Sequence, residues 1–159
     1  SSVATTITYR KGDPMIPRFK HILVPVDLTP KNRAALEIAF ELAVENKARV
    51  SLLHVTEKIE LPGEEPDDES RVFYEKIRLR FMTELETMSQ RFAEARVEVE
   101  TKVHLGKPLQ EIVEFSTTHK VDLIIMSSHA IQPNDGVQSW GTLSYKVSIA
   151  CPCPILLVK

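Results

Sequence analysis

The chain has 159 residues, of which 43% are hydrophobic and 26% are charged, and its formal net charge is -2. This length suits one domain with its own core, and 20 basic against 22 acidic residues give no reason to expect nucleic-acid binding. The five glycines are fewer than the roughly eleven that average usage predicts, so a glycine-rich phosphate loop has few residues to be built from.

The first 18 residues are polar, contain scattered prolines and lack the apolar core of a signal peptide. We expect a flexible lead-in or linker over 1–18 and one domain over 19–159. No apolar run approaches the roughly 18 residues of a membrane span, so direct membrane insertion is not expected. Cys151 and Cys153 flank Pro152 and are poorly placed for a disulfide. This pattern favours packed thiols over a soft-metal site, and a cytoplasmic location.

From residue 19 onward, short apolar runs alternate with amphipathic segments. The first run, 19–26, predicts a buried strand that ends at Asp27. Thr29 and Pro30 predict an N-cap and a first-turn proline for a helix that continues to about Asn46. A second strand is predicted over 49–55.

A loop over 61–70 precedes the clearest helical pattern, which runs from Phe73 to Phe92. Apolar residues recur there at steps of three and four, and we expect the whole stripe to lie in the core. The alternating segment 97–103 is typical of a strand near a sheet edge.

The remaining elements follow the same alternation. They are a turn at 106–108, a helix over 109–119, a strand over 121–126, a polar loop over 127–140, a helix over 141–150 and a strand over 154–158. Strict alternation predicts an α/β fold, with an open five-stranded parallel sheet and helices on both faces. Ligands in such sheets bind at the carboxyl ends of the strands, where the strand order reverses. This rule points to Asp27, Val55, Gly106 and the segment after Met126.

The residues at these strand ends exclude two common nucleotide sites. No glycine-rich turn follows the first strand, and no phosphate loop ending in Gly-Lys-Ser/Thr occurs in the chain. The sequence leaves two interpretations of Asp27 open. It can satisfy amide groups at the start of the next helix, or it can hold a sugar hydroxyl or a metal at the crevice.

The five histidines lie on different segments, and no pair has the helical spacing of a zinc site. Most are therefore expected to be structural or exposed. His129 follows Ser127 and Ser128 in the loop after the fourth strand. A hydrolase arrangement and ordinary loop polarity both remain possible interpretations of these three residues.

Six segments of the sequence together resemble the universal stress protein family, of UspA type, over 19–159. The resemblance is carried by I-L-V-P-V-D at 22–27, L-L-H-V at 52–55, G-K-P at 106–108, V-D-L-I-I-M-S-S-H at 121–129, G-T-L-S at 141–144 and C-P-I-L-L-V at 153–158. It implies an adenine nucleotide alpha-hydrolase-like sheet ordered 3-2-1-4-5. It also implies a homodimer, often formed through the last strands, and an unidentified regulatory protein partner.

The resemblance also implies a nucleotide site with an altered phosphate loop. ATP-binding members have a glycine after strand four, another three positions later, and nine residues before Gly-Ser or Gly-Thr. Here these glycine positions hold Ser127 and Ala130, and ten residues separate Ala130 from Gly141. The segment 127–142 contains no Lys or Arg, and Lys146 is the nearest cation along the chain.

By resemblance, one group of residues flanks base and ribose and another approaches phosphate. The first group is Pro25, Val26, Asp27, Val55 and Met126, and the second is Gly141, Thr142 and Leu143, with Ser127 and Ala130 in the loop. The leading hypothesis is a regulatory domain that binds ATP, with Mg, or another adenine nucleotide through this weakened loop. The alternative is a ligand-free dimerisation or interaction module, free-standing or appended to a larger protein. A slow ATPase or hydrolase that uses Asp27 or His129 is the third hypothesis.

Overall fold

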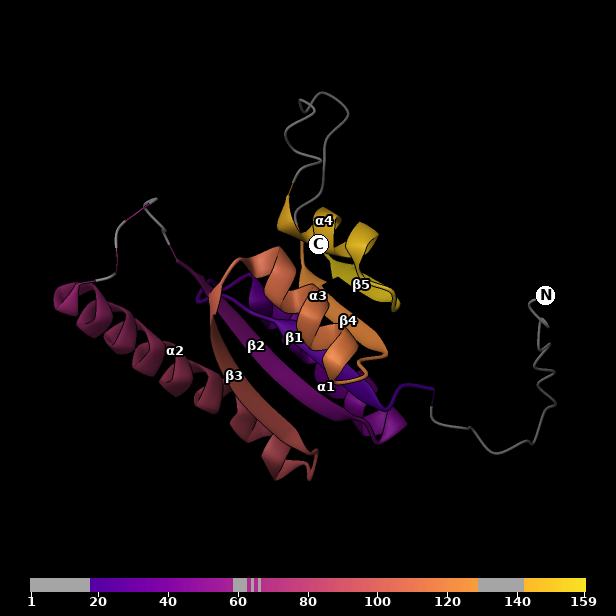
Figure 1. The fold of residues 1–159 in the computed structure, drawn as a ribbon. Coiled ribbons are helices and arrows are strands. Elements are labelled where there is room, and N and C mark those ends of the chain that lie inside the picture. The colour runs from indigo at the N-terminus through magenta and orange to yellow at the C-terminus, as the bar shows by residue number, and fades with distance from the viewer. Residues whose placement is uncertain (1–17, 59–62, 64, 66, 129–141) are drawn as a thin grey trace, which may run out of the picture.

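The computed structural model of the chain describes residues 18–58, 63, 65, 67–128 and 142–159. Strands and helices alternate along these residues (Figure 1). In chain order they are β1 (His21–Pro25), α1 (Asn32–Asn46), β2 (Arg49–Glu57), α2 (Asp68–Glu94), β3 (Val99–Gly106), α3 (Pro108–Thr118), β4 (Leu123–Ser127), α4 (Leu143–Ala150) and β5 (Ile155–Val158). The lead-in expected over 1–18 lies, apart from Arg18, outside the described residues.

The strands form one five-stranded sheet in the order β3-β2-β1-β4-β5, and every pairing is parallel. β1 lies at the centre, where Ile22 pairs with Val50 of β2 on one side and with Leu123 of β4 on the other. The chain builds outward from β1 to β3 and then returns to β4. The strand order therefore reverses between β1 and β4, and the predicted fold class and strand order are confirmed.

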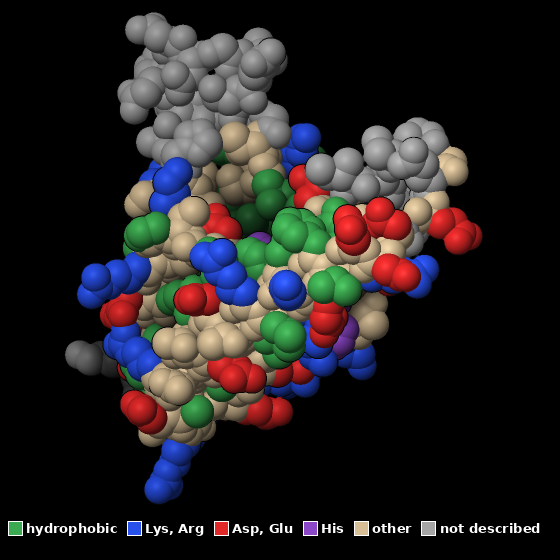
Figure 2. Space-filling view, turned by 90° about the vertical axis from the view of Figure 1, so that its left-hand side faces the viewer, with side chains coloured by type: hydrophobic (Ala, Val, Ile, Leu, Met, Phe, Trp, Pro, Cys, Tyr) green, Lys and Arg blue, Asp and Glu red, His purple; other side chains and the backbone are tan. Residues whose placement is uncertain are grey.

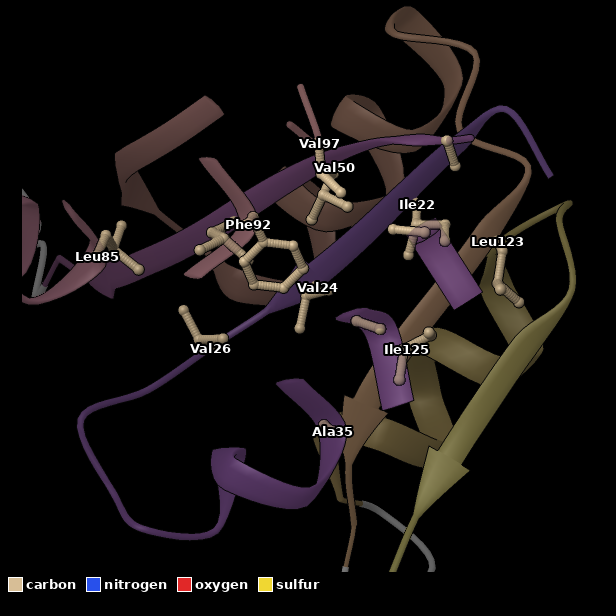
Figure 3. Close-up of a cluster of buried hydrophobic side chains, with 14 residues drawn as sticks. Ile22, Val24, Val26, Ala35, Val50, Leu85, Phe92, Val97, Leu123 and Ile125 are labelled. Carbon is tan, nitrogen blue, oxygen red and sulfur yellow. The ribbon is translucent and has the colours of Figure 1, made fainter. Parts of the chain in front are cut away.

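Both faces of the sheet are buried because alternate residues of each strand point to opposite layers. α1 and α2 cover one face, where Ile22, Val24 and Val50 pack with Phe92 of α2 (Figure 3). α3 and α4 cover the other face, where Leu23 and Ile124 pack with Phe115. The two clusters fix the sheet rigidly between its helices.

The start of α1 differs from the sequence prediction. Thr29 does not cap the helix, because its backbone N–H and its hydroxyl both donate to Asp27 Oδ1, at 2.7 and 2.5 Å. The helix begins at Asn32, and Lys31 precedes it without a side-chain cap. Asp27 thus binds the side chain that was predicted as the cap and shapes the loop after β1.

The apolar stripe of α2 is core at one end and exposed at the other. Leu85 and Phe92 are buried, whereas Phe73 is 59% exposed. The expectation that the whole stripe packs in the core is wrong, and the reason is length. A helix of 27 residues spans about 40 Å, whereas the nine residues of β2 span about 30 Å. The first turns of α2 extend past the sheet (Figure 1).

Other boundaries differ by a few residues. α2 begins inside the predicted loop, because Asp67 accepts a hydrogen bond from the backbone of Ser70 and caps the helix. β3 is an edge strand, as its alternating pattern predicted. No helix within the described residues combines the length and apolar character needed to cross a membrane.

Candidate functional site

A crevice of about 280 Å³ opens at the carboxyl ends of β1, β2 and β4, where the strand order reverses. Its floor includes Leu53, Ile112 and Met126, and its rim carries polar and charged residues. In the space-filling view of Figure 2, a hollow is visible with hydrophobic side chains on its floor and acidic and basic side chains at its rim. An apolar slot with a few polar groups is the usual form of a small-molecule site.

Asp27 is held at the edge of this crevice in one orientation. Its Oδ1 accepts the N–H and hydroxyl of Thr29 and the side-chain amide of Asn32, the last at 2.8 Å. Burial raises the pKa of the Asp27 carboxyl, but these hydrogen bonds outweigh it, and the net pKa lies below its ordinary value. Among the described residues, no group donates to Oδ2. The ionised carboxylate can therefore accept hydrogen bonds from a ligand there.

Asn32 locks the loop between β1 and α1. Its side-chain amide nitrogen donates to the Asp27 carbonyl and to the Thr29 carbonyl, the latter at 3.0 Å. Its side-chain oxygen accepts from the Asp27 backbone at 3.3 Å. Because Asn32 is 4% exposed, these contacts are shielded from water, and the Asp27 side chain is preorganised before any ligand arrives.

His54, next to Val55 at the end of β2, braces the same side of the crevice. Its Nδ1–H donates to the Val26 carbonyl at 2.7 Å, and its ring stacks on Phe81 of α2 with centroids 3.5 Å apart. Burial lowers the pKa of His54, while the Val26 hydrogen bond and the Asp27 charge oppose this shift in part. The ring is therefore neutral at pH 7.

The opposite side of the crevice is formed by the end of β4 and the start of α4. The Ser127 hydroxyl donates to the Lys31 carbonyl at 2.9 Å and joins β4 to the loop before α1. The Ser144 hydroxyl donates to Ser128 Oγ at 3.1 Å and lies 3.3 Å from Thr142 Oγ1. This side offers several hydroxyl groups, and that of Ser127 stands at a glycine position of the family pattern.

The structure brings together all the predicted site residues that it describes. The crevice is lined by Pro25, Val26, Asp27, Val55, Met126, Ser127, Thr142 and Leu143. Ala130, Gly141 and His129 lie outside the described residues. The binding roles of all these residues stay predictions.

Sequence reasoning missed Lys31, Asn32, His54 and Ser144, which also line the crevice. Position along the chain was a usable signal for three of them: Lys31 and Asn32 follow Asp27 within five residues, and His54 precedes Val55. Lys146, the cation closest in sequence to the loop, is not part of the lining.

The described part of the chain contains no group of three or more His, Cys, Asp or Glu residues arranged to hold a metal ion. Cys151 and Cys153 are free thiols, and burial raises the pKa of both. Cys151 is buried, and Ser116 Oγ lies 3.8 Å from its sulfur. These cysteines pack as the sequence predicted.

Comparison with known proteins identifies relatives along nearly the whole described chain. Residues 18–159 match the model of the universal stress protein family. Universal stress protein YxiE of Bacillus subtilis is 32% identical over 153 residues, which cover 89% of this chain and 99% of the relative.

Solved structures agree with the fold. Universal stress protein UspA from Lactobacillus plantarum superposes with a TM-score of 0.69 at 22% identity, over 89% of this chain and 99% of that one. A universal stress protein in complex with cAMP gives a TM-score of 0.63 at 16% identity, over 89% and 97% of the two chains. The Archaeoglobus fulgidus protein in complex with dAMP gives 0.59 at 18% identity, over 89% and 98%.

Proposed function

The chain belongs to the universal stress protein family, and from that premise we propose that it is a regulatory domain that binds an adenine nucleotide in the crevice between β1 and β4. The observation that carries this proposal is Asp27, whose carboxylate is ionised and fixed through Oδ1 while Oδ2 accepts no hydrogen bond from the described residues.

The adenosine part of the ligand matches the chemistry of the β1–β2 side. The adenine ring packs against the apolar residues Val55 and Met126, which line the crevice. The ribose hydroxyls donate to Asp27 Oδ2, because a carboxylate paired with neutral hydroxyls accepts stronger hydrogen bonds than a neutral oxygen. The preorganised loop reduces the ordering that binding requires.

The β4–α4 side of the crevice is less favourable for binding the phosphate part of the ligand. Ser127 and Ala130 replace two glycines of the family pattern, and Thr142 and Leu143 lead into the N-terminus of α4. A helix N-terminus favours an anion, but side chains at the glycine positions keep the backbone farther from a phosphate. We therefore propose that this chain binds ATP, as its Mg complex, less tightly than the unaltered family pattern would.

Two solved relatives support the class of ligand. Their complexes hold cAMP and dAMP, each an adenine nucleotide with one phosphate. Since both proteins are under 20% identical to this chain, the fold is the shared property and the ligand is carried over as a proposal.

Calorimetric titration with AMP, ADP and ATP at up to millimolar concentration tests the proposal. We expect saturable heat for at least one nucleotide. We expect Asp27→Ala to weaken its affinity about tenfold or more, since a charged hydrogen-bond acceptor is lost. Asp68→Ala, at the 99% exposed side chain that starts α2, is the matched control and leaves the affinity unchanged. Absence of heat with all three nucleotides would contradict the proposal.

We also propose that the domain forms a homodimer through β5. β5 is an edge strand of the described sheet, and Leu156 within it is 38% exposed. An edge strand with exposed apolar residues pairs readily with a second copy. By light scattering, we expect a dimer that Leu156→Asp shifts toward monomer. Leu105→Asp, on the opposite edge strand β3 and 45% exposed, is the control. A monomeric wild-type chain would exclude this assembly.

A ligand-free interaction module is the second candidate, and the β5 edge also favours it. The two candidates differ in one measurable property. The module keeps its dimer and gives no nucleotide heat, whereas the nucleotide-binding domain gives heat that depends on Asp27.

A further inference from the structure

Lys31 lies where the loop after β1 meets the end of β4. It is the residue before α1, and it lines both the crevice and the neighbouring groove toward the end of β5. Its carbonyl accepts the Ser127 hydroxyl at 2.9 Å, although the two residues are 96 positions apart. This bond fixes the Lys31 backbone at the point where the β1 loop meets the end of β4.

The charge of Lys31 is not neutralised by a neighbour. Within the described residues, Arg71, Arg78 and Arg91 each form an ion pair with a carboxylate, and Lys31 forms none. Asp27, the acidic residue of the crevice lining, is held through Oδ1 by Thr29 and Asn32 and forms no ion pair with Lys31. Since a lysine ammonium is a mobile point charge on a four-carbon stem, it can turn toward an anion bound in the crevice.

Hydroxyl groups gather on the same β4–α4 side of the crevice. Ser128, Thr142 and Ser144 line it, and the hydroxyls of Thr142 and Ser144 lie 3.3 Å apart. Hydroxyls can donate to phosphate oxygens after a small rotation. One cation and a group of hydroxyls are a side-chain counterpart of a backbone phosphate cradle.

We propose that Lys31 binds the phosphate of the nucleotide and supplies in this chain the attraction that glycine backbone supplies elsewhere in the family. The inference rests on the proposed function, because it assumes adenosine in the crevice. Lys31 is the one Lys or Arg in the described lining of the crevice, so the ligand class assigned to the site is an adenine nucleotide with a single phosphate group, an adenosine monophosphate. Lys31 acts there as a specificity-determining residue that favours the nucleotide over the nucleoside.

The test compares adenosine with AMP in calorimetric titrations of the wild type and Lys31→Gln. We expect the wild type to bind AMP about tenfold more tightly than adenosine, as one charged hydrogen bond predicts. Lys31→Gln should remove this preference and leave adenosine affinity unchanged. Lys31→Arg, which keeps the charge, should retain most of it. Lys146→Gln, a cation outside the crevice lining, is the matched control and should retain all of it.

Salt provides an independent readout. AMP affinity of the wild type should fall as NaCl rises, because salt screens an exposed charge pair, and Lys31→Gln should lose this dependence. An unchanged AMP preference in Lys31→Gln, or an equal loss in Lys146→Gln, would overturn the role of Lys31 while adenosine binding upheld the proposed function. A chain that binds neither adenosine nor AMP would overturn both.

Discussion

The two sides of the crevice differ in how their polar side chains are held. On the β1–β2 side, Asn32 bonds to Asp27 and to the Thr29 carbonyl, and His54 bonds to the Val26 carbonyl. On the β4–α4 side, Ser128 and Ser144 contribute hydroxyls and Lys31 contributes a charge without a carboxylate partner among the described residues. The side proposed to bind adenosine is therefore formed in advance, whereas the side proposed to bind phosphate depends on side chains that adjust to a ligand.

The largest expected effect falls on the preorganised side, at Asn32. Asn32→Ala removes the amide that joins Asp27 to Thr29 and leaves buried polar groups without partners. We expect the free energy of unfolding to fall by about 2 kcal/mol and adenosine affinity to fall about tenfold. Urea unfolding and calorimetry measure the two effects.

Asn46→Ala is the control for this prediction. Asn46 ends the same helix, and its side chain accepts from the backbone of Arg18 and Phe19 at 3.1 and 3.2 Å. Its loss should lower stability without changing adenosine affinity. If Asn32→Ala reduces stability and spares affinity in the same way, the Asp27 loop is not preorganised for the ligand.

The next effect is a pH dependence at His54. Burial holds the pKa of His54 below the ordinary 6.5. Below pH 6.5, the unfolded chain therefore binds a proton at His54 that the native ring does not bind. Stability should therefore fall as pH drops from 6.5 toward the native pKa, by up to about 1.4 kcal/mol per pH unit for one proton. His54→Phe, which keeps a ring to stack on Phe81, should flatten this slope.

His21 also has a pKa lowered mainly by burial, so some slope remains in the His54→Phe chain. Urea unfolding at several pH values between 5 and 8 measures the difference between the two profiles. Identical slopes in wild type and His54→Phe would show that His54 is not buried as a neutral ring.

The smallest effect is expected on the phosphate side, at Ser144. Ser144→Ala removes one hydroxyl next to Ser128 and Thr142, and we expect about a threefold loss of AMP affinity with adenosine affinity unchanged. Ser148→Ala, one turn farther along α4 with its hydroxyl bonded to the Tyr145 carbonyl, is the control. A loss of adenosine affinity in Ser144→Ala would show that the two sides are not separable.

The sequence predicts the fold well because alternating apolar and amphipathic segments report directly which residues are buried. The sequence predicts burial less well where burial depends on the extent of the neighbouring sheet. The periodicity of α2 is the same around Phe73 and Phe92, yet Phe92 is 2% exposed and Phe73 is 59% exposed. Periodicity identifies an amphipathic face, but it does not tell whether a sheet is long enough to cover that face.

The candidate site shows the same division. Asp27 was predicted from its place at a strand end, whereas Thr29 was predicted as a cap and instead donates to Asp27. The sequence alone does not decide whether a threonine hydroxyl caps the following helix or donates to a nearby carboxylate. The place of Lys31 near Asp27 was a usable signal, but its contact with Ser127 joins positions 96 residues apart. The parallel pairing of β1 with β4 creates that proximity, which the sequence does not reveal.

We propose that the β1–β2 side of the crevice is a preformed site for adenosine. A crystal structure of the protein soaked with adenosine, which lacks phosphate, tests it most directly. We expect a ribose hydroxyl within about 2.6–3.2 Å of Asp27 Oδ2 and the adenine ring against Val55 and Met126. An empty crevice, or adenosine bound away from Asp27, would contradict it.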